Sequence, residues 1–220
     1  MTWRDLLFAH WSVPPATVAP RLPDGLSVDE FEGDAYLGVV PFRMRIGLAG
    51  LPFRLSFDEL NLRTYVRGPD GPGVYFFNLY ADDPVGVAVA RSLFRLPYYR
   101  AETEVGRAGD GVRFRSRRTH RGVPSARFEA TYRADGPAFV PEAGSIESFL
   151  VGRYRFYTAD DGGRLYRGEI DHEPWSLRPG RAEFEENTLF EASGFDHPGG
   201  QPLVHVAEPI EVTAGRVRRT

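Results

Sequence analysis

Three polar residues at alternate positions of the segment ELNLRTYV are the strongest candidates for chemistry: Glu59, Asn61 and Arg63. Side chains of a β-strand alternate between its two faces, so this spacing would place all three on one face, about 6–7 Å apart. There an arginine could bind a carboxylate, and a buried glutamate with a raised pKa could serve as a general base. A buried structural network, or an exposed row of charges that stabilises little, would give the same pattern.

Adjacent tyrosines, Tyr98 and Tyr99, follow the dipeptide Leu96-Pro97. The apolar run 85–94 before it predicts a buried helix that ends where the proline interrupts it. A phenol could donate a hydrogen bond to a carbonyl or enolate oxygen, or it could pack in a core with only its polar tip satisfied.

The composition excludes several kinds of chemistry. The chain has no cysteine, so disulfides, thiolate nucleophiles and zinc–thiolate sites are excluded. All 27 basic residues are arginine, and no side chain can therefore form a Schiff base. The five histidines show no metal-ligand spacing, and the neighbours in DHEPW (171–175) would point to opposite faces of a strand. We expect no metal and no cofactor.

Charge and hydropathy set further expectations. The net charge of −3 favours neither a nucleic-acid nor a membrane partner, and no apolar run approaches a membrane span. We expect a cytoplasmic protein with one domain over residues 1–220 and a small-molecule ligand. The apolar stretch GLAGLPF (47–53) is compatible with a homo-oligomer.

Short strands and turn signals dominate the chain, so we predict a mainly β (α+β) fold. It would be an antiparallel, closed or nearly closed β-barrel or sheet with a few short flanking helices. The expected elements are a helix at 15–21, a hairpin near 26–46, a loop at 47–57, strands on either side of GPDGPG, a meander over 98–106, 112–118 and 126–133, and a short helix capped by Ser145.

Longer motifs resemble a known family. WRDLLFAHWSVPPATVAPRLPDGLSVDEF, ELNLRTYV, ARSLFRLPYYRAE and GRLYRGEIDHEPW are similar to segments of the DUF2071 (YqjF-like) family of uncharacterised bacterial proteins. That family in turn resembles acetoacetate decarboxylases. The resemblance implies a cone-like β-barrel with flanking helices and an interior pocket.

The resemblance also carries residue roles, in part. Arg4 matches the substrate-side arginine of the decarboxylases, and Glu59 falls where they keep an active-site glutamate. Their second pocket glutamate would fall near Pro41-Phe42 and is missing. Tyr98 and Tyr99 stand where those enzymes carry a lysine pair, one of which forms the Schiff base. The resemblance thus implies that the position of the site is retained, whereas the imine chemistry of the lysine is lost.

Three functions follow as hypotheses, and the sequence leaves open whether the protein is an enzyme. In the first, the pocket takes a small organic acid or carbonyl compound and acts as a lyase or isomerase without a Schiff base. The catalytic residues would be Glu59, Tyr98 and Tyr99, and the substrate-binding residues Arg4, Asn61 and Arg63. In the second, the protein is a non-catalytic small-molecule binder that lost the ancestral lysine. In the third, the tyrosines are core residues without a ligand.

Overall fold

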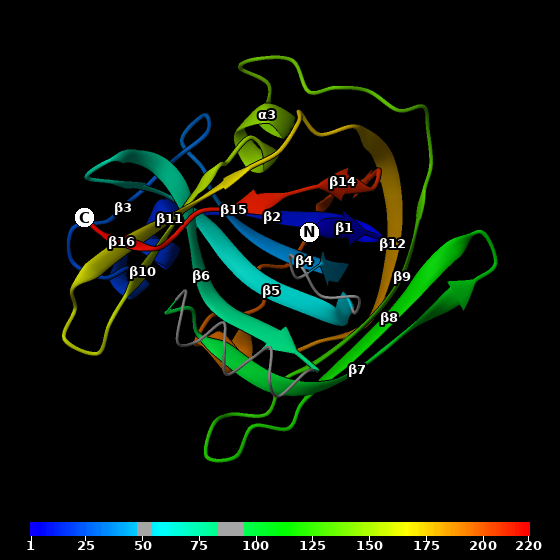
Figure 1. Ribbon diagram of the computed structural model, residues 1–220, viewed down its shortest axis with the longest axis horizontal. Coiled ribbons are helices and arrows are strands. Elements are labelled where there is room, and N and C mark those ends of the chain that lie inside the picture. Colours follow the sequence, from blue (N-terminus) through cyan, green and yellow to red (C-terminus); the bar gives the residue numbers. More distant parts are fainter. Residues whose placement is uncertain (48–53, 83–94) are drawn as a thin grey trace.

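The computed structural model describes residues 1–47, 54–82 and 95–220 (Figure 1). The predicted helix at 85–94 and most of the apolar stretch 47–53 lie outside these residues. The described helices are short: α1 (Pro15–Val18), η1 (Ala19–Arg21), α3 (Ile146–Val151) and η2 (Glu191–Ser193). None of them is long and apolar enough to cross a membrane.

Most of the described chain is β-strand. The strands are β1 (Thr2–Arg4), β2 (Leu6–Val13), β3 (Ser27–Val28), β4 (Ala35–Gly47), β5 (Arg54–Gly68), β6 (Gly71–Ala81), β7 (Tyr98–Ala108), β8 (Gly111–Arg118), β9 (Arg127–Ala134), β10 (Arg155–Ala159), β11 (Leu165–Asp171), β12 (Leu177–Asn187), β13 (Leu203–Ala207), β14 (Ile210–Glu211), β15 (Thr213–Ala214) and β16 (Arg218–Arg219). The fold is therefore mainly β, as predicted.

The strands close into a ring. Hydrogen-bonded neighbours run from β4 through β2, β13, β12, β9, β8, β7, β6 and β5 back to β4. A second arm leaves the ring at β6 and continues through β10 and β11 to β15, on the opposite side of β6 from β7 and β8 (Figure 1). In this ring every strand has a hydrogen-bonded neighbour on each side.

Two strand pairs depart from the predicted antiparallel arrangement. β6 pairs in parallel with both β7 and β10. A parallel neighbour requires a crossover connection instead of a tight hairpin, and the sequence between β6 and β7 is long enough for one. The remaining strand pairs are antiparallel, so the sheet is mixed.

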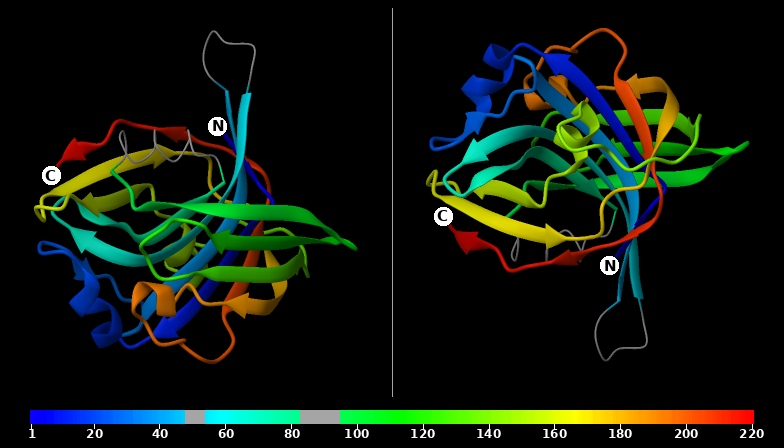
Figure 2. Two further views of the ribbon diagram at one scale, coloured as in Figure 1. Left: turned by 90° about the horizontal axis from the view of Figure 1, so that it is seen from below. Right: turned by 90° about the horizontal axis from the view of Figure 1, so that it is seen from above.

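The predicted hairpin near 26–46 was wrong. The short strand β3 pairs with β5, and β4 pairs with β5 over residues 37–47 and 54–64. Residues 54–57, predicted as loop, belong to β5. Alternation of apolar residues indicates a strand but does not identify its partner, which explains the error. The ends of β4 and β5 project from the body of the protein (Figure 2).

Several local predictions were confirmed. The GPDGPG hairpin joins β5 and β6, with Gly68 opposite Gly71. The meander is β7, β8 and β9. Ser145 caps α3, because its hydroxyl accepts a hydrogen bond from the Ser148 backbone N–H at 3.1 Å.

Two apolar cores lie on the two faces of β4, β5 and β6. The first contains side chains from every strand of the ring, including Leu60 and Leu62 of β5, so it fills the ring. The second lies on the opposite face, where β1, β10 and α3 cover the sheet. Glu59 and its neighbours face this second compartment, outside the ring.

Candidate functional site

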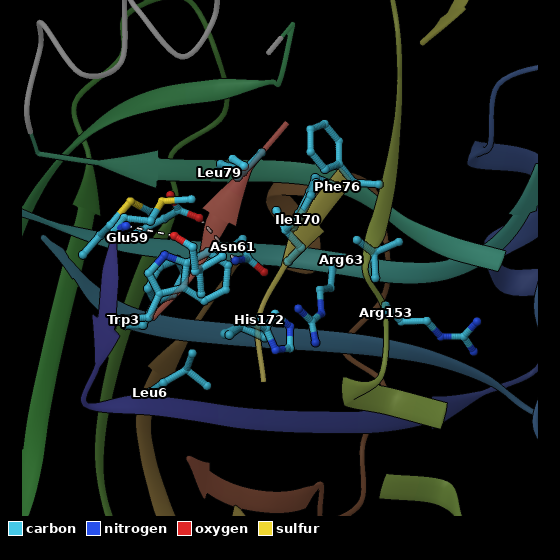
Figure 3. A pocket seen from close by; sticks show the side chains of 18 of the residues that line it. Trp3, Leu6, Glu59, Asn61, Arg63, Phe76, Leu79, Arg153, Ile170 and His172 are labelled. Carbon is cyan, nitrogen blue, oxygen red and sulfur yellow. Dashed lines mark hydrogen bonds between the residues drawn. The ribbon is translucent and has the colours of Figure 1, made fainter. Parts of the chain in front are cut away.

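A cavity of about 590 Å³ lies in the second compartment (Figure 3). This volume is in the range of ordinary ligand sites. Its wall is mostly apolar and aromatic, with contributions from Trp3, Leu6, Phe8, Phe42, Met44, Phe57, Phe76, Leu79, Leu96, Phe156, Ile170 and Trp175. Its polar side chains are Glu59, Asn61, Arg63, Tyr98, Arg153, Arg155, His172 and Thr213.

The floor of the cavity is strand β5. Glu59, Asn61 and Arg63 project into the cavity one after another along the strand (Figure 3). Leu60 and Leu62, the residues between them, are buried in the first core. Since both faces of β5 are covered by protein, the polar row is not an exposed surface row of charges.

A β-bulge in β6 completes the apolar wall. Asn78 pairs with Leu62 and Phe76 pairs with Arg63, so Phe77 is an extra residue without a partner in the register. The bulge shifts the alternation by one. As a result Phe76 and Leu79 both line the cavity, although they are three residues apart.

Glu59 is a buried carboxyl group in apolar surroundings. It is 4% exposed, and Phe42 lies directly opposite it on β4. Burial raises the pKa of Glu59 from 4.5 to about 7, while the hydrogen bonds from Tyr98 and Asn61 act in the opposite direction. A carboxyl group with this pKa exchanges protons near neutral pH, as a general acid or base must.

The two tyrosines occupy different faces of β7. The Tyr98 hydroxyl donates to Glu59 Oε2 at 2.7 Å, and Tyr98 lines the cavity. Burial and the neighbouring Glu59 carboxylate raise the pKa of Tyr98 well above 10, so its phenol stays protonated. Tyr99 packs against the first core instead, where the Arg118 guanidinium lies 4.4 Å from its ring centre.

This difference yields a prediction. Tyr98→Phe removes a hydrogen bond that stabilises the Glu59 carboxylate, so the pKa of Glu59 should rise above about 7. Tyr99→Phe is the matched control and should leave that pKa unchanged, since Tyr99 does not line the cavity. Titration of the ¹³C-labelled Glu carboxyl signals by NMR measures both. Equal effects of the two variants would contradict this assignment.

Asn61 has an open hydrogen-bonding position. Its Nδ2 donates a long hydrogen bond of 3.5 Å to Glu59 Oε1, and its Oδ1 is buried with no partner in the described part of the chain. The residue is 3% exposed. A buried carbonyl oxygen without a donor is costly, and a ligand hydroxyl or N–H in the cavity could satisfy it.

Arg63 is held by backbone and phenol oxygens. Its Nη2 donates to the Leu150 carbonyl at 3.2 Å and to the Tyr65 hydroxyl at 3.3 Å. Tyr65 also hydrogen-bonds His10 Nε2 at 2.6 Å. Within the part of the chain that the structure describes, no carboxylate lies within 4.0 Å of the Arg63 guanidinium. Arg63 therefore brings an uncompensated positive charge to the cavity.

Gly38 makes room for this cluster. It lies between His10 and Arg63 in the registers of β2, β4 and β5. A Cβ atom at residue 38 would come within 2.9 Å of the His10 ring and 3.4 Å of Arg63 Cγ. The two larger side chains meet across the glycine because it has none. Burial, followed by the charges of Arg63 and His205, lowers the pKa of His10 well below 6.5, which keeps its ring neutral.

Arg4, predicted to bind substrate, is not among the residues that line the cavity. Its neighbour Trp3 lines the cavity, and alternation along β1 turns Arg4 to the other face, opposite Arg43. On that face lies Asp58. Burial raises the pKa of the Asp58 carboxyl group, and the charge of Arg4 is one of the smaller effects that lower it. The structure therefore brings together Glu59, Asn61, Arg63 and Tyr98, and leaves Arg4 and Tyr99 outside the cavity.

His172 is a cavity residue that the sequence analysis did not select. Its Nδ1 donates to the Glu173 carbonyl at 2.6 Å, and its Nε2 is buried without a partner among the residues that the structure describes. Tyr154 and Trp175 hold the ring, with centroids 4.6 and 4.8 Å away. His172 lies just beyond the end of β11, so strand alternation did not mark it in the sequence.

A sequence profile of the family DUF2071, described as an uncharacterized conserved protein, matches residues 1–211. The chain belongs to the DUF2071 family. "Uncharacterized protein YqjF" from Bacillus subtilis (strain 168) is 37% identical over 223 residues, which cover 99% of this chain and 90% of YqjF. The resemblance noted from the sequence motifs is thus confirmed.

Solved structures of other proteins share the fold of this DUF2071 protein. Acetoacetate decarboxylase from Legionella pneumophila superposes with a TM-score of 0.67 at 14% identity, over 100% of this chain and 86% of the other. The enduracididine biosynthesis enzyme MppR, complexed with pyruvate, gives a TM-score of 0.66 at 16% identity, over 99% and 88% of the two chains. The fold is therefore acetoacetate decarboxylase-like, and identities this low establish nothing beyond the fold.

Proposed function

We propose that this DUF2071 protein catalyses proton transfer at a carbon next to a carbonyl group of an organic acid, as a lyase or isomerase does, without a Schiff base. One arrangement carries the proposal. A buried glutamate with a pKa of about 7 receives a hydrogen bond from a phenol and shares its strand face with an arginine that has no described acidic partner. A proton acceptor and an anion-binding group thus line one apolar cavity.

The residues divide the chemistry as follows. Arg63 binds the substrate carboxylate, and the Glu59 carboxylate accepts the proton from the carbon next to the carbonyl. The electron pair of the broken C–H bond moves to the carbonyl oxygen, which becomes an enolate. Before the reaction, Tyr98 donates its single hydroxyl proton to a hydrogen bond with the Glu59 carboxylate. Once Glu59 is protonated, this hydrogen bond is free to stabilise the enolate oxygen.

The structural relatives support an oxo acid as the ligand class. MppR was crystallised with pyruvate, and other relatives are named acetoacetate decarboxylase. Both names point to carboxylates that carry a carbonyl group. An imine on a lysine side chain is excluded, because the chain contains no lysine.

A non-catalytic binding protein is the second candidate. It is favoured by the tyrosines at the positions of the decarboxylase lysines, and by Phe42 near the place of their second glutamate. The cavity would then hold a ligand against Arg63 and Asn61 without turnover.

Deuterium exchange distinguishes the two candidates. The protein is incubated in D₂O with a ketone-containing acid such as 8-oxononanoate, and exchange at the carbons beside the ketone is followed by ¹H NMR. Because Glu59 must be ionised to accept a proton, the catalysed rate should rise with pH around a midpoint of about 7 and then level off. Binding without exchange would support the binding protein, and neither binding nor exchange for a panel of oxo acids would contradict both.

A further inference from the structure

The anion-binding and proton-accepting groups lie at opposite ends of the polar row. Glu59 and Arg63 are four steps apart along β5, which corresponds to about 13 Å between their Cα atoms. Figure 3 shows the three side chains spread along the strand in the order Glu59, Asn61, Arg63. Glu59 and Arg63 form no ion pair, so their charged atoms are more than 4.0 Å apart.

Arg63 is directed away from Glu59. Both hydrogen bonds of its Nη2 go to groups beyond it, the Tyr65 hydroxyl and the Leu150 carbonyl. Its positive charge also contributes, after burial, to the lowered pKa of His10. His10 and Tyr65 are themselves in hydrogen-bond contact, so the guanidinium belongs to their end of the cavity.

Glu59 is fixed at the other end. Tyr98 holds one carboxyl oxygen, and Phe42 lies opposite in the β4 register. The Phe42 ring packs on Trp3, 4.9 Å between centroids, and Trp3 belongs to β1, the strand that borders this end. The two functional groups therefore face different parts of the same cavity.

The wall between the two ends suits a hydrocarbon chain. Val40 pairs with Asn61 across β4 and β5, Phe8 lies on the neighbouring strand β2, and all three line the cavity. Asn61 supplies the polar side-chain atoms of this group, and its Oδ1 has no hydrogen-bond partner among the described residues. A cavity of about 590 Å³ would be mostly empty around an acid with three or four carbons.

We infer that the substrate is an elongated oxo acid, whose carboxylate binds Arg63 while a carbonyl group several bonds away meets Glu59. This inference rests on the proposed function. A contact of about 3 Å between substrate and protein at each end shortens the span of about 13 Å to on the order of 5–10 Å. An extended chain advances about 1.3 Å per C–C bond, so about four to eight bonds separate the two groups. An acid in which the carboxylate and the carbonyl are adjacent cannot contact both residues.

A chain-length series tests the inference. Deuterium exchange beside the ketone is measured for 4-oxopentanoate, 6-oxoheptanoate and 8-oxononanoate, whose ketones have similar intrinsic acidity. We expect the catalysed rate at equal concentration to be at least about tenfold higher for the best of the two longer acids than for 4-oxopentanoate. Equal rates along the series, or the highest rate for 4-oxopentanoate, would overturn the inference.

A neutral ketone of the same length isolates the role of the carboxylate. 2-Nonanone retains the apolar chain of 8-oxononanoate and lacks its anion, so it should exchange at least about tenfold more slowly if Arg63 anchors the acid. Arg63→Met should remove this preference for the acid. Because the comparison of the two compounds uses the unmodified protein, it remains valid even if the variant does not fold.

A binding experiment tests the geometry independently of catalysis. The terminal hydroxyl of 8-hydroxyoctanoate can reach the Glu59 carboxylate, whereas that of 4-hydroxybutanoate cannot. By calorimetry at pH 8, 8-hydroxyoctanoate should bind at least about threefold more tightly than octanoate, and 4-hydroxybutanoate no more tightly than butanoate. The absence of any exchange would contradict the proposed function alone. The absence of this length-dependent gain in affinity would contradict the inference that the ligand is elongated.

Discussion

Glu59→Gln is expected to lower the rate of deuterium exchange at the carbon beside the ketone by about 10²–10⁴-fold, the usual contribution of a positioned general base. Glutamine has nearly the shape of glutamate but cannot accept a proton. The cavity keeps its volume and Arg63 keeps its hydrogen bonds to Tyr65 and Leu150, so binding of 8-oxononanoate should persist. NMR measures the exchange rate and calorimetry the binding.

Asp58→Asn is the matched control for this loss. Asp58 precedes Glu59 in the same strand, and burial also raises the pKa of its carboxyl group. It faces away from the cavity, however, and pairs with Arg43 at 2.9 Å. The control should retain exchange. An unchanged rate in Glu59→Gln, or an equal loss in Asp58→Asn, would exclude Glu59 as the base.

Glu59→Gln should also stabilise the fold at alkaline pH. Folding raises the pKa of Glu59 from 4.5 to about 7, so the folded state binds the proton more tightly than the unfolded state. The free energy of unfolding therefore falls as pH rises from about 4.5 to 7, and the loss reaches roughly 3 kcal/mol above pH 7. Glutamine is neutral at every pH and avoids this loss.

Urea unfolding of both proteins between pH 4 and 9 measures the difference. Other titrating groups contribute equally to both proteins, so they cancel when the free energies are subtracted. Glu59→Gln should match the parent near pH 4 and exceed it by roughly 3 kcal/mol at pH 8. Glu104→Gln, at a side chain that is 81% exposed, should show no such trend. A difference that is constant with pH would show that Glu59 is not buried as a neutral acid.

Part of the site follows from local sequence. The alternation of Glu59, Asn61 and Arg63 was sufficient to place them on one face of a strand, because side-chain direction has a period of two whatever the partner strand. The hairpin at GPDGPG and the Ser145 cap were equally local, since turn and cap residues act on backbone a few residues away.

Other parts of the site depend on contacts distant in sequence. Arg4 and Tyr99 were selected because they match functional positions of the acetoacetate decarboxylases. Their neighbours Trp3 and Tyr98 line the cavity instead. Alternation states that neighbours face opposite ways, but which face meets the cavity depends on strands far along the chain. His172 was missed for a related reason, because its open Nε2 follows from the Glu173 carbonyl and from rings on Tyr154 and Trp175.

The sequence by itself determined the chemistry that is closed to this protein and the family to which it belongs. A chain without lysine or cysteine side chains has no amine or thiol nucleophile on any side chain, whatever its fold. Only the tertiary structure decided the geometry: the closed ring, the cavity on its outer face, Tyr98 as the partner of Glu59, and Arg63 turned towards Tyr65. The physical reason is that residue type sets what a side chain can do. Its charge, pKa and reach depend on neighbours that long-range strand pairing brings together.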